Sequence, residues 1–429
     1  MDLFMDIVPG RPCRPKSVSR RTFAAGLAGM ASCAALGTLT GCSLFASDDE
    51  PKHRDKDSFD VDDSSSEAKG SGGEPMEKPA KTLDDEITEE IAGWNIEQKV
   101  AQLFFVRPES FTGMGQVTAA GDTSRTAYGT YPVGGICYFA ENLVDPAQTT
   151  EMLTNMAQIG VDTIGHAPFL AVDEEGGTVT RIASNPAFGV TDVGDMAAIG
   201  DTGDVSQAKS AAQAIAGYLK PLGFNMDFAP CCDIANVEGG VMAQRSFGSD
   251  PELVSDMVEA QIEGFVESGM LCSAKHFPGI GAAIGDSHDG SISIGSTLEE
   301  LQATELVPFQ RAVQVGVPFV MVGHLSVPNV TGDDTPASIS KVMVTDVLRD
   351  QLQYDGIVVT DSLEMGAVTA YGDAGAVMAL QAGCDMVLMP LDFAAAYNAV
   401  LAAVSDGTLS EERIDESLTR ILRVKMTME

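Results

Sequence analysis

The fold is indicated most directly by one stretch, FLAVDEEGG at residues 169–177. In it, an uninterrupted apolar run is followed at once by acidic residues and a pair of glycines. Continuous apolarity, in place of an alternation with polar residues, is typical of a strand buried on both faces of a parallel sheet. The stretch therefore predicts a buried parallel strand that carries acidic side chains at its carboxyl end.

Seven more apolar runs of this kind recur at intervals of roughly 30 to 55 residues, which suit a strand, a loop, a helix and a return. They lie at 103–106, 135–139, 224–228, 270–274, 318–322, 357–360 and 386–389. Between and after them, apolar residues at helical spacing predict helices, the clearest at 146–159, 206–222, 252–268 and 410–425. Asn95 and Gln98 have the spacing of a capping box, which predicts a helix start before the first strand.

Eight such units predict an α/β fold, a (β/α)8 barrel of the TIM type, as a single catalytic domain at residues 83–429. A doubly wound open sheet is the alternative. The chain has 429 residues, of which 44% are apolar, so wholesale disorder is excluded. Its 62 acidic residues against 26 basic ones give a formal net charge of −36. Such a charge repels phosphate backbones, so we expect no nucleic acid as a partner.

The first 42 residues differ in kind from the rest of the chain. Ser19-Arg20-Arg21-Thr22-Phe23 precedes an uncharged run of small apolar residues that ends in Leu39-Thr40-Gly41-Cys42. These two motifs resemble a twin-arginine export signal and a bacterial lipobox, whose cysteine receives lipid. The run is short and weakly apolar for a stable membrane span, and an uncleaved anchor helix is the alternative.

We therefore expect a lipoprotein signal at residues 1–41 and lipidation at Cys42. Residues 42–82 are rich in Asp, Glu, Ser, Lys, Gly and Pro, a composition that predicts a disordered acidic tether. The protein is expected to be anchored to the outer face of the bacterial cytoplasmic membrane, with the lipid as its only contact to that membrane.

Polar residues follow several of the predicted strands. They are Asp173 after the third, Asp233 after the fourth, Lys275 and His276 after the fifth, His324 after the sixth and Asp361 after the seventh. In a parallel barrel the carboxyl ends of all strands converge on one face, where ligands bind. Burying so many titratable groups is costly unless they bind one another or a ligand. The pattern predicts a polar ligand pocket, although each residue alone could be a satisfied core group.

Several of these stretches, in this order, resemble glycoside hydrolase family 3, and within it the β-N-acetylhexosaminidases that act on peptidoglycan fragments. The motifs are VDEEGG at 172–177 with Arg181, FAP at 228–230 with Asp233, RSFG at 245–248, KHFPG at 275–279, DSH at 286–288 and VTDSL at 359–363. The resemblance covers about residues 90–425. The DSH triplet separates this branch from the β-glucosidases.

The resemblance implies a retaining mechanism in which Asp361 is the nucleophile and His288, paired with Asp286, is the acid/base. The residue types suit these roles, because a strand tip holds a carboxylate rigidly and imidazole titrates near neutrality. It further implies that the first sugar is held by Asp173, Arg181, Arg245, Lys275 and His276, with His324 in the same pocket. No metal and no organic cofactor are implied.

The expected activity is hydrolysis of terminal β-linked N-acetylglucosamine from peptidoglycan-derived or related glycans. A β-glucosidase or a glycoside phosphorylase of the same family could carry the same motifs, and a non-catalytic glycan-binding lipoprotein is a further possibility. The chain departs from the family at Ile280, where a histidine is usual after the KHFPG motif. This change bears on the loop conformation and on the leaving group. The oligomeric state is left open.

Overall fold

The computed structural model describes residues 81–287 and 290–428, which belong to one structural unit, Glu77–Glu429. The predicted export signal, Cys42, residues 42–80 of the tether and the predicted acid/base His288 lie outside the described residues. Across the described part, no helix combines the length and the apolarity needed to span a bilayer.

Within this part, eight parallel strands form one sheet in the order β10-β1-β2-β3-β4-β5-β7-β9. They are β1 (Phe104–Val106), β2 (Gly135–Cys137), β3 (Phe169–Val172), β4 (Met226–Asp227), β5 (Leu271–Phe277), β7 (Phe319–Val322), β9 (Ile357–Thr360) and β10 (Val387–Leu388). The outermost strands of that order also meet, because the Thr360 N–H donates to the Met386 carbonyl at 3.1 Å beside a parallel bridge from Val359 to Met386. The sheet is therefore a nearly closed barrel, which confirms the predicted TIM-type fold.

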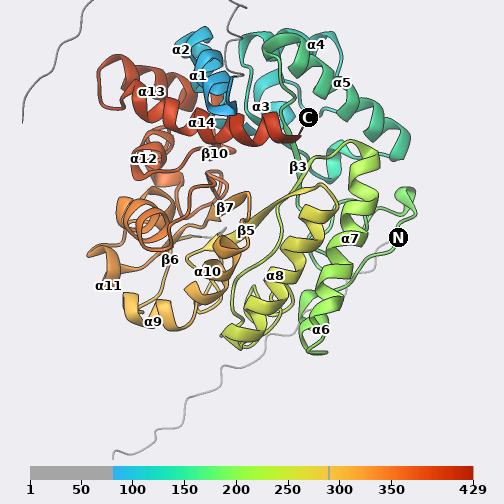
Figure 1. Ribbon diagram of the computed structural model, residues 1–429, viewed down its shortest axis with the longest axis vertical. Coiled ribbons are helices and arrows are strands. Elements are labelled where there is room, and N and C mark those ends of the chain that lie inside the picture. Colours follow the sequence, from blue (N-terminus) through green and yellow to red (C-terminus); the bar gives the residue numbers. More distant parts are fainter. Residues whose placement is uncertain (1–80, 288–289, 429) are drawn as a thin grey trace, which may run out of the picture. The chain divides into compact units, whose positions relative to one another are not determined.

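Helices surround the strands, and the last of them, α14, lies beside the first two (Figure 1). The longer helices are α1 (Leu83–Gly93), α5 (Pro146–Ile164), α7 (Val205–Leu222), α8 (Pro251–Glu267), α10 (Leu306–Gln314), η4 (Val342–Gln351, a π-helix), α12 (Ala374–Ala382), α13 (Phe393–Ser405) and α14 (Glu411–Met428). The helix predicted at 146–159 runs five residues further, to Ile164. The capping box of Asn95 and Gln98 is confirmed at the start of α2 (Ile96–Ala101).

The remaining elements fill the connections. They are α3 (Pro108–Thr112), α4 (Asp122–Thr130), η1 (Ala140–Asn142), η2 (Pro186–Phe188), α6 (Met196–Gly200), β6 (Ile292–Ser293), α9 (Leu298–Ala303), β8 (Leu325–Ser326), α11 (Pro328–Thr331), η3 (Ala337–Ile339) and η5 (Thr369–Tyr371). β6 and β8 pair with each other in parallel, outside the barrel sheet. This pair returns the long loop after β5 to the end of β7, and so confines that loop to the carboxyl face of the barrel.

The core explains why the strand runs are mainly apolar. On β1, Phe104 packs edge-on against Phe393 of α13, with ring centroids 5.4 Å apart. The next residue, Phe105, contacts Phe169 of β3 and Phe228, which follows β4, with ring centroids 6.4 and 5.2 Å away. One face of the strand therefore meets the helices and the other fills the barrel. Burial of each such ring contributes about 2–3 kcal/mol to stability.

Candidate active site

Two hollows lie at opposite ends of the barrel strands. The larger, of about 680 Å³, is lined by residues that precede strands, such as Asn225 and Pro318, and by no acidic residue or histidine among those described. The smaller, of about 200 Å³, lies at the carboxyl ends. Its lining includes seven of the predicted site residues: Asp173, Arg181, Arg245, Lys275, His276, Asp286 and Asp361. The smaller hollow is therefore the candidate active site.

Its floor is a network of buried charges centred on Glu175. The Glu175 carboxylate accepts two hydrogen bonds from Arg245, from Nε at 2.8 Å and from Nη2 at 2.7 Å. It also lies 2.7 Å from Lys275 Nζ, which donates in turn to Asp173 Oδ1 at 2.9 Å. Glu175 and Lys275 are each only 2% exposed, so these contacts are screened little by solvent. The network fixes an ammonium and a guanidinium at the edge of the hollow.

The electrostatics of this network keep Glu175, Lys275 and Arg245 ionised. Burial alone would raise the pKa of Glu175, but the charges of Lys275 and Arg245 outweigh burial and hold the pKa well below its ordinary value. For Lys275, burial would lower the pKa, yet Asp173 and Glu175 raise it above the ordinary value of 10.5. Such fixed charges are the donors and acceptors that sugar hydroxyls require.

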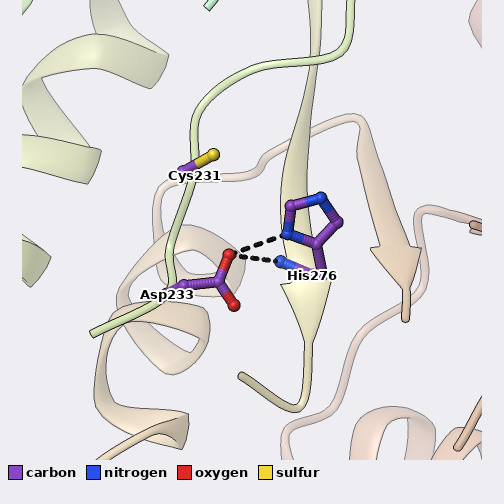
Figure 2. A group of neighbouring side chains, drawn as sticks. All are labelled: Cys231, Asp233 and His276. Carbon is purple, nitrogen blue, oxygen red and sulfur yellow. Dashed lines mark hydrogen bonds and ion pairs between the residues drawn. The ribbon is translucent and has the colours of Figure 1, made fainter. Parts of the chain in front are cut away.

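His276 is oriented by Asp233, which is fully buried. One carboxylate oxygen of Asp233 lies 2.8 Å from His276 Nδ1 and 3.1 Å from its backbone nitrogen (Figure 2). Because a carboxylate only accepts, Nδ1 donates its hydrogen to Asp233. Arg245 Nη2 lies 3.4 Å from Nε2. The pair therefore fixes the imidazole within the hollow.

Cys231, Asp233 and His276 could also be considered as metal ligands, since one atom of each lies within 4.8 Å of the others. Three observations argue against a resident cation at this point. The Asp233 carboxylate already accepts from His276, the Cys231 thiol donates to Glu175 Oε2 at 3.3 Å, and the Arg245 guanidinium is adjacent. Burial also raises the pKa of Cys231 well above its ordinary value, which disfavours the thiolate. The group serves to orient His276.

Asp361 continues β9, and its backbone N–H donates to the Val322 carbonyl at 2.8 Å. Its Oδ1 accepts from the Ser362 N–H at 2.7 Å, and no helix starts at Asp361. Burial alone would raise the pKa of Asp361. His276, His324, the Ser362 N–H and Lys275 together outweigh burial, and the pKa lies below the ordinary value of 3.8. The side chain is therefore an ionised carboxylate at the wall of the hollow.

His324 does not line the hollow but lies behind Asp361. It is buried, and its Nδ1 and Nε2 lie 2.7 Å from Ser338 Oγ and 2.8 Å from the Ser362 carbonyl oxygen. The structure places it as a support for the backbone next to Asp361, and direct contact with substrate stays a prediction.

The loop after β5 brings Asp286 and Ser287 to the hollow. The Ser287 carbonyl accepts from the Ala367 N–H at 3.2 Å, which ties this loop to the segment after β9. The loop therefore approaches the same cavity as Asp361. Ile280, where the family usually has histidine, also lines the hollow, and its N–H donates to Asp233 Oδ1 at 2.7 Å.

Arg181 reaches the hollow because Glu174 shapes the segment before it. The buried Glu174 carboxylate accepts from the backbone N–H groups of Arg181, Ile182 and Ala183 at 2.6–2.8 Å. Arg181 Nη2 then lies 3.9 Å from Asp173 Oδ2, too far for a hydrogen bond. Its Nη1 donates to the Thr180 carbonyl at 3.4 Å, and Nη2 faces the mouth of the hollow beside Asp173.

Two positioning residues, Glu175 and Asp233, were absent from the predicted site set. Glu175 lies two residues after Asp173, and in an extended continuation of β3 both side chains point the same way. This spacing could have identified Glu175 as a site residue from the sequence. Asp233 was visible as a residue after the fourth strand, but its pairing with His276 depends on where two loops meet.

The sequence profile described as the glycosyl hydrolase family 3 N terminal domain matches residues 95–424. A β-hexosaminidase of Pseudomonas aeruginosa is 35% identical over 274 residues, which cover 63% of this chain and 79% of that protein. The β-hexosaminidase A of Pseudoalteromonas piscicida is 32% identical over 323 residues, covering 69% of this chain and 53% of that protein.

Solved structures agree with these relatives. The family 3 β-N-acetylglucosaminidase of Paenibacillus sp. str. FPU-7 matches with a TM-score of 0.73 and 38% identity, over 78% of this chain and 63% of that one. The chain thus spans about half the length of the Pseudoalteromonas protein and under two thirds of the Paenibacillus one. Taken with the barrel and the charged hollow, these matches show that the chain belongs to glycoside hydrolase family 3, on its β-N-acetylhexosaminidase branch.

Proposed function

We propose that this protein hydrolyses terminal β-linked N-acetylglucosamine from peptidoglycan-derived or related glycans, with retention at the anomeric carbon. The observation that carries the proposal is the meeting of two segments at one hollow. The Asp361 carboxylate and the loop of Asp286, which leads to His288, line the same cavity as Lys275 and His276. A retaining glycosidase needs such a pairing of a carboxylate nucleophile with a proton donor.

In the first step, an oxygen of Asp361 attacks the anomeric carbon while the bond to the leaving oxygen breaks. His288 gives its proton to that oxygen, and Asp286 stabilises the imidazolium before the transfer. The lowered pKa of Asp361 keeps the nucleophile ionised at neutral pH. In the second step, His288 takes a proton from water, whose oxygen attacks the same carbon and releases Asp361.

The sugar that reacts is held by the charged rim. Asp173 and Lys275 offer an acceptor and a donor 2.9 Å apart, a pair that suits neighbouring hydroxyls. Arg181, Arg245 and His276 extend the same rim. Rigid placement of these groups lowers the barrier because the substrate is held in the reactive orientation.

The experiment compares p-nitrophenyl N-acetyl-β-glucosaminide with p-nitrophenyl β-glucoside at equal concentration. We expect release of p-nitrophenol from the first and much less from the second. Asp361→Ala should lose at least 10³-fold in kcat, as expected when a nucleophile is removed. Asp346→Ala, on the exposed side of η4, is the matched control. A fully active Asp361→Ala variant would remove the mechanism, and equal rates on both sugars would favour a β-glucosidase.

The same assay separates hydrolysis from phosphorolysis and from binding without turnover. Added phosphate should leave the product as free N-acetylglucosamine, whereas a sugar phosphate would identify a phosphorylase. Tight binding of the sugar without turnover would identify a glycan-binding lipoprotein.

We also propose that the catalytic domain works outside the cytoplasmic membrane, tethered through lipid on Cys42. The proposal rests on the twin-arginine and lipobox motifs of the sequence. Fatty-acid labelling of the protein expressed in bacteria should depend on Cys42, and Cys42→Ser should move the protein out of the membrane fraction. Membrane attachment that survives this change would contradict the tether.

A further inference from the structure

The larger hollow, at the amino ends of the barrel strands, lies apart from the candidate active site. Its volume of about 680 Å³ falls within the range of sites that bind small molecules. The apolar walls of this amino-end hollow are Phe224, Val266, Met270, Leu271, Pro318 and Met428. Val266 and Met428 are 51% and 36% exposed, which is high for large apolar side chains. The hollow therefore presents apolar surface that the domain itself leaves uncovered.

The charged side chains that line this hollow, among the residues that the structure describes, are both lysines. Lys220 of α7 is exposed, and its Nζ donates to the Ser268 carbonyl at 2.6 Å. Lys425 of α14 is only 1% exposed. A chain with a formal net charge of −36 thus has a hollow lined by two cations and by no described carboxylate. Charge complementarity favours an anion as its ligand.

The Lys425 amine has fewer partners than it has hydrogens. Its Nζ donates to Gln102 Oε1 at 2.8 Å and lies 5.0 Å from the centroid of the Phe169 ring. Within the described part of the chain, it makes no other hydrogen bond and no ion pair. An ammonium has three donors, and burying one without a counter-charge is costly. A carboxylate on a ligand would supply both an acceptor and the missing negative charge.

The titration of this amine supports the same conclusion. Burial lowers the pKa of Lys425 from 10.5 to about 7, although the charge of Glu90 on α1 opposes the shift. Glu90 is itself paired with His166 Nε2 at 2.7 Å. Together with Lys220 in the same hollow, these two are the titratable groups of the described chain around Lys425. A bound anion would raise the pKa of the amine again, so anion binding should be coupled to proton uptake.

We propose that the amino-end hollow binds a small carboxylate on an apolar body, with the carboxylate paired to the Lys425 ammonium. The apolar walls take up the hydrocarbon part, and Lys220 adds a second positive charge. An uncharged ligand of the same shape gains the apolar contacts alone. Because the catalytic hollow lies at the opposite ends of the strands, this assignment does not depend on the proposed function.

The test measures binding of octanoate and of octan-1-ol, its uncharged match, to the full-length protein by calorimetry at pH 6. Lys425→Met keeps the length of the side chain but removes its charge. It should weaken octanoate binding about tenfold, as expected for a lost charged hydrogen bond, and leave octanol binding unchanged. Lys341→Met is the matched control, because Lys341 is exposed at the start of η4 and does not line the hollow. It should bind both probes like the wild type.

A second measurement uses the wild type alone. Octanoate should bind about tenfold more weakly at pH 9 than at pH 6, because the free amine loses its proton over this range. Octanol binding should not change with pH. Lys425→Met should lose the pH dependence of octanoate binding, which separates the titration of Lys425 from that of Glu90 and His166.

Equal octanoate affinity of the wild type and Lys425→Met would overturn the assignment. So would octanol that binds as tightly as octanoate, or no octanoate binding at millimolar concentration. If Lys425→Met does not fold, the wild-type measurements decide. Octanoate affinity that stays constant between pH 6 and pH 9 refutes the pairing with Lys425, and the expected fall supports it.

Discussion

The charges of individual residues determine how the catalytic hollow binds its substrate. Glu175 carries one negative charge between the guanidinium of Arg245 and the ammonium of Lys275. Without it, the buried Lys275 and the partly buried Arg245 face each other with only Asp173 to compensate them. Glu175 is therefore a positioning residue, which acts on the substrate through its two neighbours.

Glu175→Gln should lower kcat/KM about 100-fold and stability by about 3 kcal/mol, because breaking a buried ion pair leaves charge uncompensated. Chemical denaturation and steady-state kinetics on p-nitrophenyl N-acetyl-β-glucosaminide measure both effects. Glu263→Gln, which removes an exposed partner of Lys209, should change stability by less than about 1 kcal/mol. Equal, small effects of the two substitutions would show that the network is dispensable.

The pKa of Asp361 makes a separate prediction about acid. Because that pKa lies below 3.8, the carboxylate stays ionised down to lower pH than an ordinary aspartate. The kcat/KM, which reports the first step, should therefore persist as pH falls from 6 to about 4, provided that circular dichroism shows the protein folded. A loss of kcat/KM centred between pH 5 and 6 in folded protein, without a change in its fold, would contradict this prediction.

Site residues could be inferred from the sequence only where they directly follow a predicted strand. Asp173, Lys275 and Asp361 follow apolar runs directly, so the barrel topology places them together. Pairings such as Asp233 with His276 could not be inferred, because they depend on how two loops fold against each other. His324 shows the same limit, since its hydrogen bonds to Ser338 and Ser362 depend on loops beyond the strand.

At the level of elements, the loop after β5 carries the largest share of the mechanism. It runs from KHFPG to β6, and its course is set partly by a close approach at Gly281. A Cβ on Gly281 would lie 1.7 Å from the Ile234 carbonyl oxygen, whereas one on Gly290 of the same loop would meet no atom within 4 Å.

Gly281→Ala should therefore displace the loop and lower kcat at least tenfold, because small misplacements of an acid/base group are costly. Gly290→Ala is the matched control, expected to remain within about twofold of the wild type. The comparison uses kcat on the aryl substrate and the thermal midpoint of each variant. Wild-type kcat in Gly281→Ala would mean that the loop tolerates displacement.

The eight barrel strands were predictable because each is buried and lies in a mainly apolar run of the sequence. β6 and β8 were not, since each pairs one apolar residue with a serine, in Ile292–Ser293 and Leu325–Ser326, and Ser293 is exposed. The extension of α5 to Ile164 was also missed. Its end is set by Gly165, whose φ of 87° requires the left-handed conformation that glycine adopts readily.

At the scale of the whole domain, the last helix, α14, packs against α1 and α2 and contacts Gln102, just before β1. Lys425 of α14 is fully buried, donates to Gln102 Oε1 at 2.8 Å and lies 5.0 Å from the centroid of the Phe169 ring. Burial lowers its pKa from 10.5 to about 7, despite the opposing charge of Glu90. The last helix thus places the Lys425 amine at the end of the barrel opposite the candidate active site. Among the described residues, no carboxylate forms an ion pair with this amine.

This lysine should make stability depend on pH. Between pH 7 and 10.5 the unfolded chain binds more protons at Lys425 than the folded protein does, so stability rises with pH. The rise should be about 2 kcal/mol from pH 7 to 9, and Lys425→Met should lack it. Denaturation of both proteins at the two pH values measures the difference. Identical pH dependence would show that the buried amine keeps its ordinary pKa.

The central claim is that Asp361 bonds covalently to the sugar, and trapping that adduct tests it most directly. A 5-fluoro analogue of N-acetylglucosaminyl fluoride reacts through a good leaving group, while the second fluorine slows release of the intermediate. Mass spectrometry of the intact protein and its peptides should show one added sugar, attached to the peptide that contains Asp361 and absent in Asp361→Ala. Turnover of the probe without an adduct, or an adduct on another carboxylate, would contradict the account.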